Sequence, residues 1–153
     1  MIIKINNKET KTAEEIRSIF QVSYAVEAEI LKAVNFPPLK RSLENYLQSN
    51  TAFYGYLENG KLTAVIEIDV DNNFVLIRSL VVHPYFFRQG IASKLLTFVF
   101  TTYKSNLFVV ETGLENGPAK KLYKKFDFIE VHQWDTEFGI RKIKFEKLVK
   151  KLI

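Results

Sequence analysis

Apolar residues recur along the chain with two different periods, and each period predicts a different kind of element. The short apolar run at 2–5 predicts a strand. Thr12 and Glu15 have the spacing of a capping box, which marks a helix start. The apolar positions that follow recur every three or four residues, at Ile16, Ile19, Phe20, Tyr24, Ile30 and Leu31. They predict a long amphipathic helix, unbroken or broken once, that stops at Pro37-Pro38.

The middle of the chain changes from helical spacing to strands. Leu39, Leu43, Tyr46 and Leu47 still lie on one face of a second, shorter helix. After it come three apolar runs that predict consecutive antiparallel strands, at 52–57, 62–70 and 74–83. Asn59-Gly60 separates the first two runs, and an Asn-Gly pair is a strong hairpin signal.

The second half alternates helices and strands. Ile91, Leu95, Phe98 and Val99 predict a helix over 90–104, and a compact apolar strand follows at 107–111. Pro118 suits the first turn of another helix, and strands at 128–134 and 140–147 end the pattern. With neither an internal repeat nor a linker in the sequence, residues 1–153 are predicted to form one α/β domain.

Composition narrows the classes of function. Hydrophobic residues make up 47% of the 153 residues, which is enough for a core. The sequence has no cysteine, so disulfides, zinc–thiolate sites and a cysteine nucleophile are excluded. Its two histidines, His83 and His132, lack the neighbours of a metal site, so no metal is expected. No segment approaches the roughly 20 apolar residues of a membrane span, and we expect a cytoplasmic protein with no membrane partner.

The net charge of +5 has three interpretations, and the tail at 141–151 carries much of it. Nucleic acid, a small polyanionic ligand, or a solvated face could each account for it. The lysines of the tail alternate with Ile143, Phe145 and Leu148, which favours the outward face of a strand or of a final turn. The sequence shows neither a reading helix nor an aromatic platform, so we expect no nucleic-acid partner.

The turn at 82–92 carries the first chemical signal. A strand ends at His83-Pro84, and a short loop then enters a helix whose first turn contains Gly90 and Ala92. Helix N-termini leave backbone N–H groups unpaired, and small residues let a phosphate approach them. Arg88 and Lys94 add positive charge nearby. A purely structural turn would have the same residues.

The order of residues here resembles the GNAT superfamily of N-acetyltransferases. The pyrophosphate loop of that family reads Gln/Arg-x-x-Gly-x-Gly/Ala, and this chain has Phe87-Arg88-Gln89-Gly90-Ile91-Ala92 after the strand end Leu80-Val81-Val82-His83-Pro84. Phe87 departs from the pattern at its first position. A second stretch, Asn116 to Tyr123, is similar to the family's Asn-x-x-Ala-x-x-Leu-Tyr helix. The Gly-Phe that usually follows appears as Asp127-Phe128.

The resemblance implies a mostly antiparallel twisted sheet of six to seven strands flanked by about four helices. It also implies acetyl-CoA as co-substrate, an amine acceptor on a small molecule, peptide or protein, and allows a homodimer. Asn116 would contact the coenzyme arm, and Tyr123 would lie near the thioester sulfur. Together the cofactor-binding residues implied are Leu80, Val81, Val82, Arg88, Gln89, Gly90, Ile91, Ala92, Ser93, Asn116 and Tyr123.

Catalysis of such a transfer requires a base, because the amine attacks only in its neutral form. A free Glu has a pKa of about 4.3 and a lysine-like amine about 10.4, so full transfer costs about 8 kcal/mol unless burial or a water relay helps. The resemblance favours Glu111 at the end of its strand, where a structural carboxylate is the alternative. Glu67 is the rival base, with an outward polar position on its strand as the alternative.

Tyr123 is the candidate acid, and a hydrogen bond to the departing sulfur costs less than full proton transfer, which is uphill by about 2 kcal/mol. A core position on its helix is the alternative. Backbone N–H groups near 80–82 would polarise the carbonyl. Segments that wall the substrate pocket in this family contain Tyr24, Phe36, Trp134 and Phe138, each of which could equally be a core residue. A non-catalytic acyl-CoA-binding module is the alternative function, because of Phe87.

Overall fold

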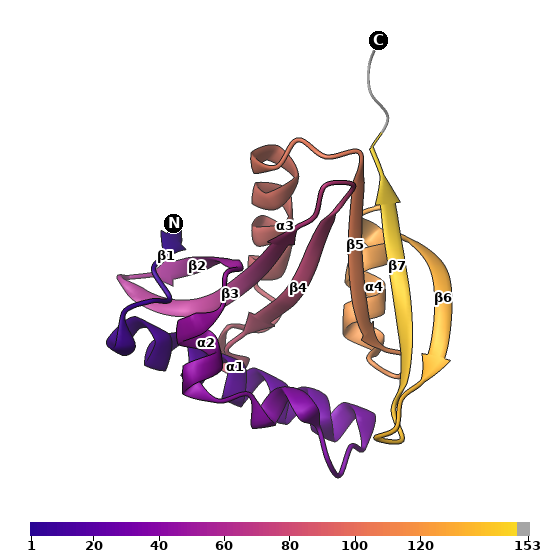
Figure 1. Cartoon of the computed structure of the whole chain (residues 1–153), viewed down its shortest axis with the longest axis horizontal. Coiled ribbons are helices and arrows are strands. Elements are labelled where there is room, and N and C mark those ends of the chain that lie inside the picture. Colours follow the sequence, from indigo (N-terminus) through magenta and orange to yellow (C-terminus); the bar gives the residue numbers. More distant parts are fainter. Residues whose placement is uncertain (150–153) are drawn as a thin grey trace.

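The structure is a computed structural model that describes residues 1–149, so Lys150 and Lys151 of the basic tail lie outside it. Seven strands form one sheet in the order β1-β2-β3-β4-β5-β7-β6 (Figure 1). Every neighbouring pair is antiparallel except β4 and β5, which are parallel. The strands are β1 (Ile2–Ile5), β2 (Ala52–Glu58), β3 (Lys61–Val70), β4 (Val75–Val82), β5 (Leu107–Gly113), β6 (Ile129–Asp135) and β7 (Arg141–Leu148). This is the mixed sheet that the sequence predicted.

The first helix begins before its predicted start at Thr12 and ends at Leu31, before the predicted stop at Pro37-Pro38. Helix α1 (Thr10–Leu31) runs unbroken for 22 residues. The predicted capping box is wrong: the N-cap is Glu9, it makes no side-chain cap hydrogen bond, and Thr12 Oγ1 instead donates to the Glu9 carboxylate at 3.4 Å. The next predicted helix divides into a 3₁₀ turn, η1 (Pro37–Lys40), and α2 (Leu43–Gln48), which Ser42 caps through the amide of Asn45.

The remaining elements follow the predicted boundaries closely. The hairpin between β2 and β3 turns at Asn59 and Gly60, whose φ angles of 51° and 78° are those that an Asn-Gly turn adopts. A short 3₁₀ turn, η2 (Pro84–Phe86), follows β4 and leads into α3 (Ile91–Thr102). Helix α4 (Gly117–Lys125) follows β5.

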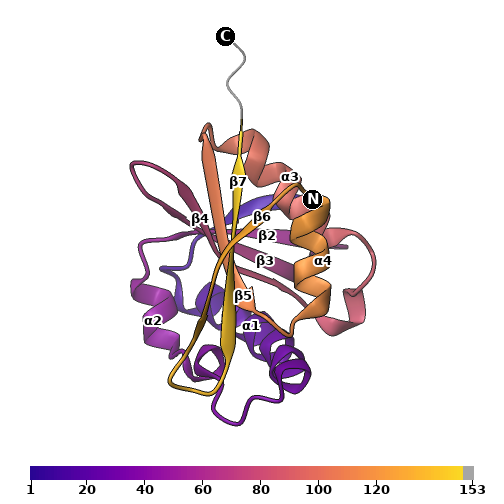
Figure 2. The same cartoon turned by 90° about the vertical axis from the view of Figure 1, so that its right-hand side faces the viewer.

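Two apolar cores lie on opposite faces of the sheet. On one face α3 and α4 cover residues of β2 to β5 and β7, including Ile66, Phe108 and Phe145. On the other, α1 and α2 pack against β2, β3 and β4 around Phe20 and Tyr46. Figure 2 shows α4 and α2 on opposite sides of the strands. Strands β2, β3 and β4 therefore present alternate side chains to two different sets of helices.

The sheet divides between β4 and β5, and this division positions the site. The two strands pair only where Val75–Ile77 faces 108–110, and they then diverge (Figure 1). Arg78 is an extra residue at this point, since β3 residue Glu67 pairs with Ser79 and the next residue, Ile68, pairs with Ile77. Such a bulge bends its strand and increases the twist. Helix α1 runs along the diverging end toward the β6–β7 turn.

Candidate functional site

The loop that leads into α3 presents a row of unpaired backbone amides. Arg88 and Gly90 both have left-handed φ angles, 63° and 75°. Within residues 1–149 no hydrogen-bond acceptor is recorded for the amides of residues 88–93, and residues 87–90 are exposed. Backbone that alternates in this way forms anion-binding concavities, and the α3 dipole adds a partial positive charge.

The side chains of this loop contribute less than its backbone. Phe87 is 41% exposed and occupies the position where the family pattern has Gln or Arg. Lys94 Nζ lies 3.3 Å from the Tyr56 hydroxyl and faces the Tyr56 ring. Tyr56 therefore holds the Lys94 ammonium group next to the loop. Nothing lies within 4 Å of a Cβ built on Gly90, which leaves open space in front of the amides.

The edge of β4 carries backbone donors that face the gap left by β5. The His83 amide donates to Thr63 of β3. In an antiparallel ladder alternate residues bond to the same neighbour, so the amide of Val81 also points to β3, while those of Leu80 and Val82 point to the other side. Beyond Ile77 that side has no strand partner. Of the backbone amides predicted as donors at 80–82, those of Leu80 and Val82 face the gap and that of Val81 does not.

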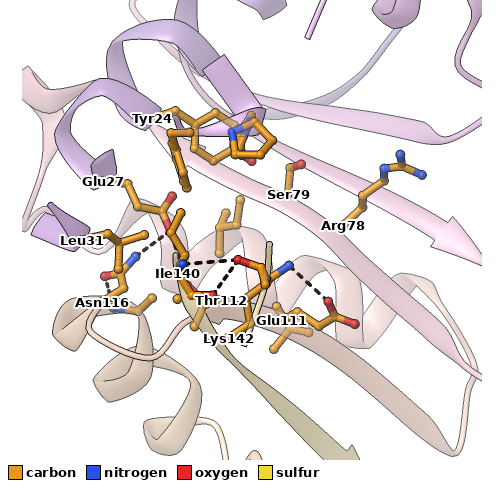
Figure 3. Close-up of a pocket in the computed structure, with 18 of the residues that line it drawn as sticks. Tyr24, Glu27, Leu31, Arg78, Ser79, Glu111, Thr112, Asn116, Ile140 and Lys142 are labelled. Carbon is orange, nitrogen blue, oxygen red and sulfur yellow. Dashed lines mark hydrogen bonds and ion pairs between the residues drawn. The ribbon is translucent and has the colours of Figure 1, made fainter. Parts of the chain in front are cut away.

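A cavity of about 820 Å³ lies at the divergence of β4 and β5 (Figure 3). Residues of α1, the α1–η1 loop, β4, β5, α4 and the β6–β7 turn line it. It contains four of the predicted site residues, Leu80, Glu111, Asn116 and Tyr123. Residues 81–93 do not line it, so the amide row and the cavity are separate parts of the site, joined by β4.

Tyr123 is both a core residue and a cavity residue. It is 5% exposed and packs edge-on against Phe128, with ring centroids 5.5 Å apart. No hydrogen bond to its hydroxyl is recorded in the described part of the chain, although it lines the cavity. Burial, and after it the negative charge of Glu27, raises the pKa of Tyr123 well above its usual value. The phenol therefore stays protonated and able to donate.

The turn after α4 explains why Asp127-Phe128 can stand where the family has Gly-Phe. Asp127 has a left-handed φ of 67°. Its amide donates to Lys124 O at 3.1 Å, and the Phe128 amide donates to Tyr123 O at 3.0 Å. These two bonds form a Schellman motif, in which Gly is usual and Asp is tolerated at the left-handed position. The same motif brings Phe128 onto Tyr123.

Asn116 holds two elements together. Its Oδ1 accepts from the Ala119 amide at 3.2 Å, which caps α4. Its Nδ2 donates to Glu27 Oε1 at 3.0 Å, so the amide ties the start of α4 to the C-terminal part of α1 (Figure 3). The predicted contact between Asn116 and the coenzyme stays a prediction.

The two carboxylates predicted as bases have very different environments. Glu111 lines the cavity with its side chain 38% exposed, and Lys142 Nζ lies 3.2 Å from Oε1. Its role as base stays a prediction. The outward position given for Glu67 is wrong: it is fully buried, because its face of β3, which it shares with Val65, is covered by α1 and α2.

Glu67 is also bound too fully to serve as a base. Arg41 donates two hydrogen bonds to it, at 2.7 and 2.9 Å, and the hydroxyls of Thr51 and Ser79 donate at 2.7 and 3.1 Å. Burial acts to raise the pKa of Glu67, but the bonds from Arg41 and Thr51 and the nearby positive charges outweigh it and lower the pKa. Glu67 is outside the cavity lining and is a structural residue.

Glu27 is a cavity residue that sequence reasoning missed. It lies on α1, partly buried, with Oε1 bound by Asn116 and, at 3.5 Å, by Thr112 Oγ1. Burial raises the pKa of its carboxyl, and the bonds from Asn116 and Thr112 and the charge of Lys142 oppose that shift only in part. In the sequence it is one of several glutamates on α1, and its partners are 85 and 89 residues away.

Three of the four aromatic residues named from the sequence line the cavity: Tyr24, Phe36 and Phe138. Trp134 lies outside that lining and stacks on His132 instead, with ring centroids 5.3 Å apart. The other histidine, His83, accepts from the Tyr85 amide. Residues 1–149 contain no group of three or more His, Cys, Asp or Glu residues arranged to hold a metal ion. No helix in the same range is long and apolar enough to span a membrane.

A model of the acetyltransferase (GNAT) family matches residues 13–128. The chain belongs to this family. Solved GNAT structures share its fold along nearly the whole chain. The ribosomal-protein-S18-alanine N-acetyltransferase of Escherichia coli superposes with a TM-score of 0.76 and 20% identity, over 99% of this chain and 95% of that one. The PaiA N-acetyltransferase of Thermoplasma acidophilum, solved in complex with coenzyme A, has a TM-score of 0.74 and 17% identity, over 97% and 99%.

A curated relative is closer in sequence. UPF0157 protein YqkA of Bacillus subtilis (strain 168) is 35% identical over 129 residues, which is 84% of this chain. The chain spans only 38% of the length of that relative. The similarity therefore concerns only part of a longer protein.

Proposed function

We propose that this GNAT protein transfers the acetyl group of acetyl-CoA to the primary amine of an acceptor. The observation that carries the proposal is the row of unpaired amides at 88–93, which β4 joins to a cavity holding a protonated phenol, Tyr123. A binding site for an anion therefore follows the strand, β4, whose residue Leu80 lines the cavity that holds the proton-transfer site.

The donor side of the site rests on backbone groups. The amides of residues 88–93 would receive the pyrophosphate, with the Arg88 side chain beside them and Ile91, Ala92 and Ser93 in the first turn of α3. Because these are backbone donors, Phe87 at the first position of the loop does not remove them. By the family resemblance, the pantetheine arm would lie along the edge of β4 at Leu80, Val81 and Val82. Asn116, at the start of α4, would contact the same arm.

Acetyl-CoA would supply an acetyl group as a thioester. Transfer forms a bond between the amine nitrogen and the acetyl carbon and breaks the carbon–sulfur bond, and a proton from the amine ends on the sulfur. The Leu80 and Val82 amides point toward the gap where the carbonyl oxygen would sit, and preorganised donors of this kind stabilise the developing charge. Tyr123 would donate a hydrogen bond to the departing sulfur.

The acceptor amine needs a base, and Glu111 is the candidate that the family resemblance favours. Its position in the cavity lining supports this role. Its ion pair with Lys142 weighs against it, because an acceptor amine would have to compete with Lys142 for the carboxylate. A water relay would have to lie between Glu111 and the amine for this assignment to hold.

The test is acetyl-CoA consumption with a panel of primary amines, amino acids and peptides, together with calorimetric titration of acetyl-CoA. We expect turnover with at least one amine, and we expect Tyr123→Phe to lower kcat on the order of 100-fold while the Kd for acetyl-CoA changes little. Binding without turnover on any acceptor would favour a non-catalytic acyl-CoA-binding module. Unchanged turnover in Tyr123→Phe would remove that residue from catalysis.

A further inference from the structure

Glu27 occupies the cavity in a way that leaves half of its carboxylate available. Asn116 and Thr112 both bind Oε1, at 3.0 and 3.5 Å. Among the described residues no hydrogen bond or ion pair is recorded for Oε2. One oxygen therefore fixes the orientation of the side chain, and the other can contact a molecule in the cavity (Figure 3).

Four of the other charged residues around the cavity, Arg41, Arg78, Glu111 and Lys142, are paired, whereas Glu137 is exposed on the β6–β7 turn. Arg41 binds Glu67, and Lys142 binds Glu111 at 3.2 Å. The Arg78 guanidinium lies 3.9 Å from Asp69 and extends away from the middle of the cavity (Figure 3). Glu27 differs from the paired acids because its hydrogen-bond partners are an amide and a hydroxyl, which are neutral.

The groups that face Glu27 come from three elements besides its own. Tyr24 is one turn away on α1, Thr112 lies on β5, Tyr123 lies on α4, and Lys142 on β7 is the one cation that acts on the carboxyl. Lys142 is held by Glu111. Within residues 1–149, three acids line the cavity: Glu111 is paired with Lys142 and Glu137 is exposed on the β6–β7 turn, so Glu27 is the partly buried acid that an entering cation meets.

We infer that Glu27 binds the ammonium group of the acceptor and takes the proton that the amine must lose before it attacks. This assignment rests on the proposed acetyl transfer and replaces Glu111 as the base. The proton passes from nitrogen to Oε2, the freed electron pair forms the bond to the acetyl carbon, and the carbon–sulfur bond breaks. The second proton of the attacking nitrogen then goes to the sulfur.

Two features of the cavity support this inference. Because burial raises the pKa of Glu27, the gap between its pKa and that of an amine is smaller than for a free carboxyl, and the transfer costs less. The walls beside it are apolar, formed by Leu31, Phe36, Pro38 and Phe138. The acceptor class that fits is a primary amine on an apolar chain or ring.

The direct test compares Glu27→Gln with Glu29→Gln, using benzylamine and acetyl-CoA. The glutamine introduced by Glu27→Gln keeps an oxygen that can accept from Asn116, so the fold should survive, which circular dichroism would check. Glu29 is exposed on the same helix and outside the cavity lining. We expect Glu27→Gln to lower kcat/KM on the order of 100-fold with the Kd of acetyl-CoA unchanged, and Glu29→Gln to match the wild type. An active Glu27→Gln, or an equal loss in Glu111→Gln alone, would overturn the assignment.

A second acceptor separates proton removal from simple binding. O-Benzylhydroxylamine has a similar shape, but its amino group is uncharged at neutral pH and needs no base. With this acceptor, the loss of kcat/KM caused by Glu27→Gln should be at least tenfold smaller than with benzylamine. In the wild type, the acidic limb that Glu27 gives the pH profile of kcat/KM with benzylamine should be absent with O-benzylhydroxylamine. An equal loss with both acceptors would reduce Glu27 to a structural residue.

A third measurement does not depend on turnover. The carboxyl ¹³C signal of Glu27, assigned by its disappearance in Glu27→Gln, should titrate at a lower pH when benzylammonium is added, since a bound cation favours the carboxylate. If the titration of Glu27 shifts on addition of benzylammonium but no acceptor is acetylated, the ammonium site is supported and the proposed transferase function is not. A Glu27 signal that does not respond to benzylammonium would overturn the inference even in an active enzyme.

Discussion

The ion pair between Arg41 and Glu67 gives the sharpest stability prediction. Glu67 is fully buried and accepts four hydrogen bonds, two of them from Arg41, whose side chain is only 14% exposed. Replacing Arg41 with Met leaves a buried carboxylate with only the Thr51 and Ser79 hydroxyls. Removing one partner of a buried pair costs about 3–5 kcal/mol. It also removes the guanidinium from the Tyr46 ring, 4.2 Å away.

A loss of this size lowers the Tm by roughly 6–20 °C, at about 2–4 °C per kcal/mol for a chain of this length. Thermal and urea unfolding followed by circular dichroism would measure it. Arg78→Met is the matched control, because its guanidinium lies 4.0 Å from the same carboxylate but is half-exposed; it should cost less than about 1 kcal/mol. Arg41→Met combined with Glu67→Gln should be more stable than Arg41→Met alone.

The pH dependence of stability gives an independent check, because the wild type and Arg41→Met should respond to falling pH in opposite directions. In the wild type the pKa of Glu67 is lowered, so its stabilising contribution is present above the unfolded-state pKa and is lost as the pH falls through the folded one. In Arg41→Met the uncompensated burial raises that pKa instead, so the variant should gain stability as the pH falls. A destabilisation under about 1 kcal/mol, or parallel pH curves, would refute this account of the pair.

Three further changes test particular residues. Gly90→Ala should weaken acetyl-CoA binding in calorimetry and cost about 1–2 kcal/mol in urea unfolding, because its φ is 75°; Gly117→Ala, where the added Cβ has open space, should not. Asp127→Gly should stabilise the chain by about 1 kcal/mol in the same assay by relieving a left-handed residue. Glu27→Gln should raise the Tm at pH 7 but not near pH 4, because a raised carboxyl pKa means that stability falls as the pH rises through it.

Local chemistry accounts for what the sequence predicted correctly. The Asn59-Gly60 turn, the loop before α3 and the start of α4 at Pro118 all depend on residues adjacent in the chain. The capping box failed because Thr12 and Glu15 satisfy a pattern that any first turn can show, while the helix begins two residues earlier, at Thr10. Local signals fix where an element lies more reliably than where it begins.

The site residues could be predicted only where they lie within one short segment of the sequence. The amides at 88–93 and the pair Asn116 and Tyr123 could be found in this way. Glu67 could not, because it is buried by α1 and α2, which cover its face of β3, and paired with Arg41, which is 26 residues away in the sequence. Glu27 could not, because its environment comes from residues 85 and 89 positions away.

The electrostatics of the cavity couple the two proton transfers that the proposed reaction needs. The negative charge of Glu27 helps to raise the pKa of Tyr123, after the larger effect of burial. If Glu27 takes the proton of the acceptor amine, that charge disappears and the pKa of Tyr123 falls. The phenol then becomes a stronger hydrogen-bond donor at the stage when the sulfur leaves. A base on α1 and an acid on α4 would thus act in a fixed order, because the first transfer prepares the second.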